Sequence, residues 1–153
     1  MKARQYRRPH WRLFRAEAAI VLMAAATSMS VAAADDWPAL RQGMWEFDRT
    51  IETPGTAGKP KTIQMKKCTR PTEDMSKQNE MLTKGGCRFS PIQKTGNAYS
   101  YSAYCKMQGV AMKSSSVLTV DGDSAYILRV ESQTGSEVTK EVLRARRTGD
   151  CAK

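Results

Sequence analysis

The stretch MKSSSVLTVDGDSAYILRVES, residues 112–132, decides how this chain folds. At its centre lies the pair Asp121-Gly122, with a run of strand-like length on either side, 112–120 and 124–132. Asp-Gly between two such runs is a strong signal for a tight hairpin, because its turn needs residues that tolerate positive φ. The sequence therefore predicts two antiparallel strands joined at this turn.

The same pattern of short strands and turns extends outward from this hairpin. A second hairpin is expected around a three-residue loop, Thr95-Gly96-Asn97, and Thr134-Gly135 is expected to turn into the last strand. Outside the first hairpin, strands are expected over 43–51, 61–68, 87–94, 98–106 and 137–147. The fold class is therefore mainly β: an antiparallel meander of about seven strands, curved or closed into a small barrel.

One short helix is expected between the second and third strands. Thr72 is placed to cap its N-terminus, with Glu73 and Asp74 in the first turn, where the helix dipole favours acidic side chains. Gly85-Gly86 is expected to end it.

The first strand alternates apolar and polar residues. Trp45, Phe47 and Ile51 share one face, which Arg49 interrupts. Aromatic side chains usually bury where their area is largest, so Trp45 and Phe47 are assigned to the core rather than to a ligand-stacking surface. Tyr99, Tyr101 and Tyr104 are likewise assigned to cross-strand packing rather than to a sugar or lipid groove.

The chain has four cysteines, Cys68, Cys87, Cys105 and Cys151, and an even count in a small exported chain indicates two disulfides. Three connectivities are open. The second hairpin places Cys87 opposite Cys105, which favours that bridge together with Cys68–Cys151. The competing scheme joins Cys68 to Cys87 across the helix and leaves Cys105 with Cys151. No CxxC pair occurs, so neither a metal site nor a redox motif is expected.

Residues 1–34 have the three parts of a Sec-type secretory signal. A basic n-region precedes the short apolar run at 18–26, and Ala32-Ala33-Ala34 supplies the small residues for cleavage before Asp35. The apolar run is too short to span a membrane. We therefore expect one disulfide-bonded β domain over 35–153, located in the periplasm or secreted.

Cleavage would change the charge and the chemistry of the chain. The 153 residues include 25 basic and 15 acidic side chains, a net charge of +10. The signal holds six of the basic residues and one acidic residue, so the remainder has a net charge of +5 and no nucleic-acid partner is expected. The only histidine, His10, lies in the signal. Catalysis and metal ligation that need histidine are thus not expected, and neither an enzyme activity nor a cofactor is predicted.

A basic group on the last strand is the one candidate ligand site. Lys140, Arg144 and Arg146 share one face of that strand, and Arg147 follows them. Together they are a candidate anion-binding site for phosphate-rich lipid or an acidic protein. A solvated face that discourages edge-to-edge pairing is the favoured interpretation of the same residues.

The ordered motifs of the chain resemble a known family. They are Gly43-Met44-Trp45-Glu46, the cysteines, the Gly96-Asn97 hairpin, and the terminal Gly149-Asp150-Cys151. This set resembles the bacterial exported family known as domain of unknown function 3617, over about 40–151. One departure is Arg70, which separates Thr69 from Pro71 and shifts the expected start of the helix. The resemblance implies export and supplies no activity and no site residues.

These observations favour a monomeric, non-enzymatic binding module of the cell envelope, which holds a hydrophobic or anionic ligand. The alternative is a module that binds a protein partner, such as an inhibitor of another enzyme, because rigid disulfide-bonded loops lose little entropy on binding. A deep apolar cavity would favour the first function.

Overall fold

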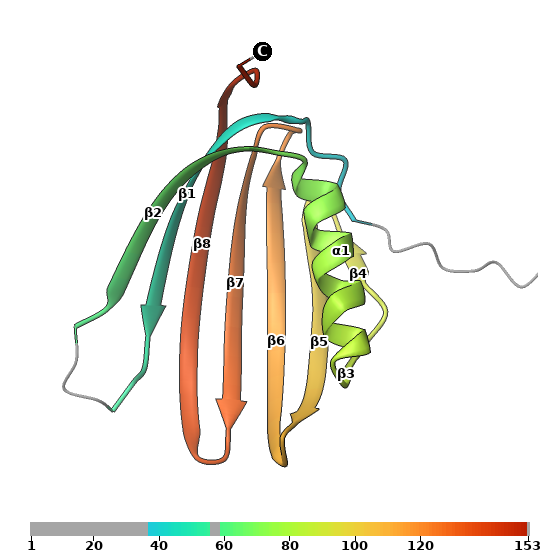
Figure 1. Cartoon of the computed structure of the whole chain (residues 1–153), viewed down its shortest axis with the longest axis vertical. Coiled ribbons are helices and arrows are strands. Elements are labelled where there is room, and N and C mark those ends of the chain that lie inside the picture. Colours follow the sequence, from blue (N-terminus) through green and yellow to red (C-terminus); the bar gives the residue numbers. More distant parts are fainter. Residues whose placement is uncertain (1–36, 56–58, 153) are drawn as a thin grey trace, which may run out of the picture. The chain divides into compact units, whose positions relative to one another are not determined.

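The computed structural model describes residues 37–55 and 59–152. It contains one antiparallel sheet of eight strands and one helix between β2 and β3 (Figure 1). The elements are β1 (Gly43–Glu52), β2 (Lys61–Thr69), α1 (Pro71–Lys84), β3 (Cys87–Phe89), β4 (Gln93–Thr95), β5 (Ala98–Met107), β6 (Val110–Asp121), β7 (Ala125–Thr134) and β8 (Glu137–Gly149). The antiparallel, mainly β class is thus confirmed.

The sheet is curved and open, so the expectation that it might close into a barrel is wrong. Its strand order is β2-β1-β8-β7-β6-β5-β3, with β4 paired to β5, and β2 and β3 lie at opposite edges. Closure is not needed to bury the apolar face, because α1 and the segment at 37–42 pack on it (Figure 1). The hairpin predicted at Asp121-Gly122 forms, with Asp121 paired to Ala125 and a turn of three residues, Gly122, Asp123 and Ser124. The strand after Thr134-Gly135 forms as predicted.

The prediction of seven strands missed a break in the third. Residues 87–94 form two short strands, β3 and β4, on either side of 90–92, which include Pro91. Proline cannot donate to a ladder hydrogen bond, so the pairing stops there. The turn between β4 and β5 contains only Gly96 and Asn97, because Thr95 pairs with Ala98. At the break, residues 90–92 face only two residues of β5, which shifts the pairing by one residue. This shift offsets the shorter turn, so Cys87 pairs with Cys105.

The helix begins earlier than Thr72, which is not its N-cap. Arg70 occupies the N-cap without a side-chain hydrogen bond, and Pro71 takes the first helical position, where its missing N–H costs nothing. The Thr72 hydroxyl instead accepts a hydrogen bond from the Leu40 N–H and donates one to the Pro38 carbonyl. Thr72 therefore fastens the N-terminal segment to the helix. The helix ends at Lys84, before Gly85-Gly86 as predicted.

The core lies between the sheet and the helix. Trp45 and Leu118 are fully buried, and the Trp45 ring lies 5.7 Å from that of Tyr126. The indole N–H of Trp45 donates to the Arg41 carbonyl at 3.0 Å, so burial leaves its polar atom paired. The core assignment of Trp45 and Phe47 agrees with these burials.

Two disulfides close the fold at different places. Cys87–Cys105 joins β3 to β5, and Cys68–Cys151 joins β2 to the residues after β8. This is the first of the two pairings set out above. Disulfides persist in oxidising compartments, so both bridges indicate a location outside the cytoplasm.

The predicted signal at 1–34 lies outside the described residues and stays a prediction. Among the residues that the structure describes, no helix has the length and apolar character to cross a membrane.

Candidate functional site

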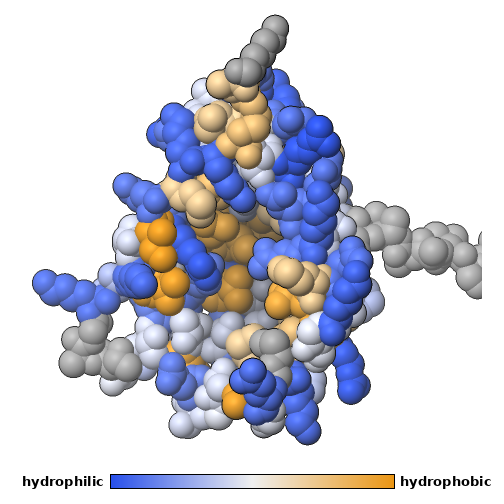
Figure 2. Space-filling view, in the orientation of Figure 1, coloured by the Kyte–Doolittle hydropathy of each residue, from blue (hydrophilic) through white to orange (hydrophobic). Residues whose placement is uncertain are grey.

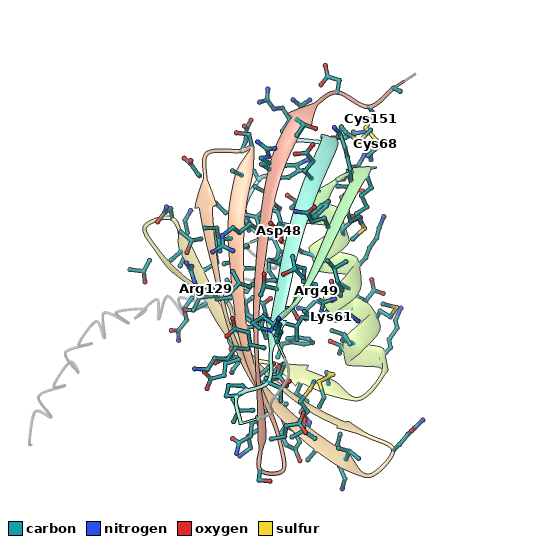
Figure 3. All side chains as sticks on the ribbon, turned by 90° about the vertical axis from the view of Figure 1, so that its left-hand side faces the viewer. Asp48, Arg49, Lys61, Cys68, Arg129 and Cys151 are labelled. Atoms are coloured by element: carbon teal, nitrogen blue, oxygen red, sulfur yellow. A yellow bond between two sulfur atoms is a disulfide. The ribbon has the colours of Figure 1, made fainter. Side chains whose placement is uncertain are left out.

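The two faces of the sheet differ in chemistry. On β1, alternate residues from Trp45 point toward the helix, and those from Glu46 point away. In Figure 3, Arg49 and Lys61 lie on the helix side, while Asp48 and Arg129 lie on the other. The helix side is called the concave face below, and the opposite side is called the outer face.

A hollow of about 240 Å³ lies on the concave face beneath the helix. Figure 2 views this face and shows hydrophobic side chains inside a depression. The apolar side chains that line the hollow come from α1, the N-terminal segment and four strands: Trp37, Met75, Leu82, Phe89, Tyr101, Ala103, Met112, Leu118, Leu128 and Val130. Sequence reasoning placed the tyrosines on a packing face, and Tyr101 in fact packs on Trp37 and lines the hollow.

A few polar groups lie among these apolar side chains. Ser114, Ser116 and Ser132 line the hollow from β6 and β7. Burial raises the pKa of the Tyr101 phenol, so the ring stays neutral beside them. The indole N–H of Trp37 is buried and has no hydrogen-bond acceptor among the described residues. An apolar cavity with a small number of polar groups is the usual form of a small-molecule site.

An ion pair stands at the wall of the hollow. The Arg49 guanidinium donates two hydrogen bonds to the Glu141 carboxylate, each 2.7 Å long. The hydrogen bond to Glu141 raises the pKa of Arg49, so the cation is held in its charged form. The pair neutralises its own charge and places hydrogen-bonding groups at the edge of an apolar surface.

The helix covers the hollow but is lightly anchored. Of its 14 residues only Pro71 is buried, while Met75 and Leu82 are half-buried where they line the hollow. The remaining helix surface is polar except for Met81, which is 67% exposed. The helix therefore covers the hollow through few apolar side chains.

The outer face carries a wider groove of about 920 Å³. The groove is lined by Asn97 and by three consecutive residues of each of five strands, 46–48, 64–66, 119–121, 125–127 and 144–146. Because side chains alternate along a strand, the first and third residues of each group face the groove. Its charges are largely balanced within the protein. Glu46 lies 2.6 Å from Arg146 and 3.2 Å from Lys66, and these hydrogen bonds lower its pKa. The groove is larger than the hollow, but polar atoms make up a larger share of its lining.

The four basic residues of the candidate anion site are not brought together. Lys140, Arg144 and Arg146 lie on the outer face, whereas Arg147 pairs with Trp45 in the register and its side chain is only 13% exposed. Arg146 pairs with Glu46, and Lys140 lies 3.7 Å from Glu131. Arg144 has no acidic partner within 4.0 Å in the part of the chain that the structure describes. Anion binding by these residues stays a prediction.

Fold and site together define a class: a small disulfide-bonded protein with an open antiparallel sheet, whose concave face holds an apolar hollow under a single helix. The family model described as "Protein of unknown function (DUF3617)" matches residues 40–151, and the chain belongs to this family. No curated protein and no solved structure is significantly similar to the chain.

Proposed function

We propose that this protein is an exported, non-enzymatic binding protein that holds an apolar or amphipathic small molecule in the concave hollow. The apolar lining of the hollow carries the proposal. Its volume of about 240 Å³ is somewhat below the ~300–1,000 Å³ of most ligand sites. It suits a small ligand, or the end of a longer chain whose remainder lies along the open concave face past Ile63 and Met65.

The polar groups of the hollow support a ligand that carries an oxygen atom. The serine hydroxyls can donate and accept hydrogen bonds, and the Trp37 N–H is a hydrogen-bond donor with no acceptor among the described residues. Binding without catalysis is proposed because these groups are weak acids and bases, and the one charged pair, Arg49 and Glu141, is mutually neutralised. The two disulfides support the exported location.

Native mass spectrometry of the protein purified from its own host tests for a retained molecule. Binding is then measured with a doxyl-labelled stearic acid, whose nitroxide quenches tryptophan fluorescence on contact. Trp37, in the wall of the hollow, is the reporter. We expect saturable quenching. A protein that carries no small molecule and shows no quenching would contradict the proposal.

Two adjacent serines on β6 give matched variants. Ser114 is half-buried and lines the hollow, whereas Ser115 is exposed and points to the outer face. Ser114→Phe fills the hollow and should abolish quenching, while Ser115→Phe adds the same side chain elsewhere and should preserve it. Equal binding by both variants would place the fatty acid outside the hollow.

A further inference from the structure

The two edges of the sheet are built differently. At one edge lie β3 and β4, each three residues long and separated by the break at Pro91, and α1 packs beside β3. Short strands and proline are the usual means of preventing a sheet edge from pairing with another chain. The edge formed by β3 and β4 is therefore protected.

The opposite edge, β2, has none of these devices. Its nine residues pair with β1 without a register shift, and no proline interrupts them. Only its last residue, Thr69, is buried. In the described chain no strand lies beyond β2, so its second side presents backbone N–H and C=O groups over about 30 Å, at about 3.4 Å per residue.

The charged side chains of β2 and of the residues that flank it in the sequence are all basic. Residues 59–72 contain five basic side chains and no acidic one: Lys59, Lys61, Lys66, Lys67 and Arg70. Lys66, Lys67 and Arg70 each lie within 4.0 Å of a carboxylate of the same chain. Lys59 and Lys61 have no such partner among the described residues. Between these cations, Ile63 and Met65 expose apolar surface on the concave side, 36% and 52%.

From these observations we propose that the free edge of β2 is a docking site for an extended acidic segment of a partner protein, which adds to the sheet as a further strand. Backbone hydrogen bonds supply the affinity in this mode of recognition, and side chains supply the selectivity. Lys61, Ile63, Met65 and Lys67 share one face of β2, so the partner would place two apolar residues opposite Ile63 and Met65 and an acidic residue on either side of them. The proposal is independent of the hollow and its ligand.

A second copy of this chain suits the edge poorly. Two β2 strands paired about Gln64 would place Lys61 directly opposite Lys67 twice, and like charges directly opposite each other destabilise a strand pair. The same five basic residues would be repeated on both sides of the new ladder. Charge complementarity thus selects an acidic partner.

The test uses a synthetic nine-residue peptide with both ends blocked, in which alternate residues on one face read Glu, Val, Val, Glu to match Lys67, Met65, Ile63 and Lys61, and the remaining residues are threonine. Hydrogen–deuterium exchange of the full-length protein is measured with and without millimolar peptide. We expect slower exchange in 61–69 and no change in β3 and β4. A peptide with lysine in place of glutamate should not bind. A peptide methylated on its backbone nitrogens should also lose binding, since it cannot donate the ladder hydrogen bonds.

Charge variants complete the experiment. Lys59→Gln with Lys61→Gln removes two cations that have no partner within the described chain, and should weaken peptide binding about fivefold. Lys106→Gln with Lys113→Gln makes the same change on β5 and β6 and should leave binding unchanged. Unaltered exchange in β2, or equal binding of the methylated peptide, overturns the proposal. Concentration-dependent protection of β2 without peptide also overturns it, because it assigns the edge to a second copy.

Discussion

Arg49 and Glu141, 92 residues apart in the sequence, meet on the concave face in a two-point ion pair. Neighbouring strands bring them together: Glu141 of β8 pairs in register with Ile51 of β1, two residues from Arg49 on the same face. A charged residue thus occupies a position of β1 that alternation alone would make apolar. The partner across the sheet is what makes this tolerable, since a lone cation on an apolar surface loses hydration without compensation.

The Arg49–Glu141 pair should couple measurably but modestly. In a double-mutant cycle of Arg49→Met and Glu141→Gln, urea unfolding should give a coupling free energy of about 0.5–1 kcal/mol, because the Arg49 side chain is 46% exposed and water screens the pair. Added salt should reduce the coupling. A coupling free energy of several kcal/mol would mean that the pair is far less hydrated than its exposure indicates.

Trp45 should be the most costly single truncation in the core. Trp45→Ala should lower the free energy of unfolding by about 3–5 kcal/mol, because a fully buried indole is removed and its cavity cannot collapse completely. Val117→Ala, at an exposed position on the outer face, is the control and should change it by no more than about 0.5 kcal/mol. Chemical denaturation measures both. A near-neutral Trp45→Ala would contradict the core assignment.

The two disulfides should stabilise unequally. Cys68–Cys151 closes a loop with a sequence separation of 83, against 18 for Cys87–Cys105. On the chain-entropy account, these loops correspond to about 4.5 and about 3 kcal/mol. Cys68→Ser with Cys151→Ser should therefore destabilise more than Cys87→Ser with Cys105→Ser, as measured by urea unfolding. The reverse order would show that strand pairing around β3 depends on its bridge beyond the entropy of the loop.

Local sequence signals were sufficient for most of the sheet. The hairpin predicted at Asp121-Gly122 forms because the tight turn needs positive φ, and Gly122, the first of the three turn residues, has φ of 60°. Alternation on β1 correctly identified Trp45 and Phe47 as core residues. Both signals act between residues close in sequence, which is why they are readable without a structure.

Features set by distant contacts were not predictable. The eighth strand exists because the ladder stops at Pro91 and resumes with a one-residue offset, and only the β5 partner reveals that offset. Threonine is a residue type that often caps helices, but the Thr72 hydroxyl hydrogen-bonds to Leu40 and Pro38, which are more than 30 residues away in the sequence. Whether the sheet closes depends on what covers its concave face, and no local pattern encodes this.

The candidate site was even harder to predict from the sequence than the fold. The hollow is lined by residues from α1, the N-terminal segment and six strands, so no single stretch of sequence identifies it. The one available hint was Arg49, which interrupts an apolar face and needs a partner. The basic residues of β8 were recognisable as a group in the sequence. The strand register, however, places Arg146 beside Glu46, and Arg147 lies on the opposite face of the sheet from Arg146. Spacing along one strand cannot show such cross-strand pairing.

The last prediction concerns acid. Glu46 on β1 accepts hydrogen bonds from Lys66 of β2 and Arg146 of β8, and these lower its pKa below the ordinary value of 4.5. A carboxyl group whose pKa is lower in the folded state contributes stability above its unfolded pKa and loses that contribution as the pH falls through the folded value. Glu46→Gln should therefore be less stable than the parent at neutral pH. The difference should shrink as the pH falls below 4.5 and vanish once Glu46 is protonated. Urea unfolding at a series of pH values measures this, with Glu137→Gln as the control at an exposed glutamate that has no ion pair among the described residues. A difference between Glu46→Gln and the parent that stays constant from neutral to acid pH would show that Glu46 stabilises by packing rather than by its charge.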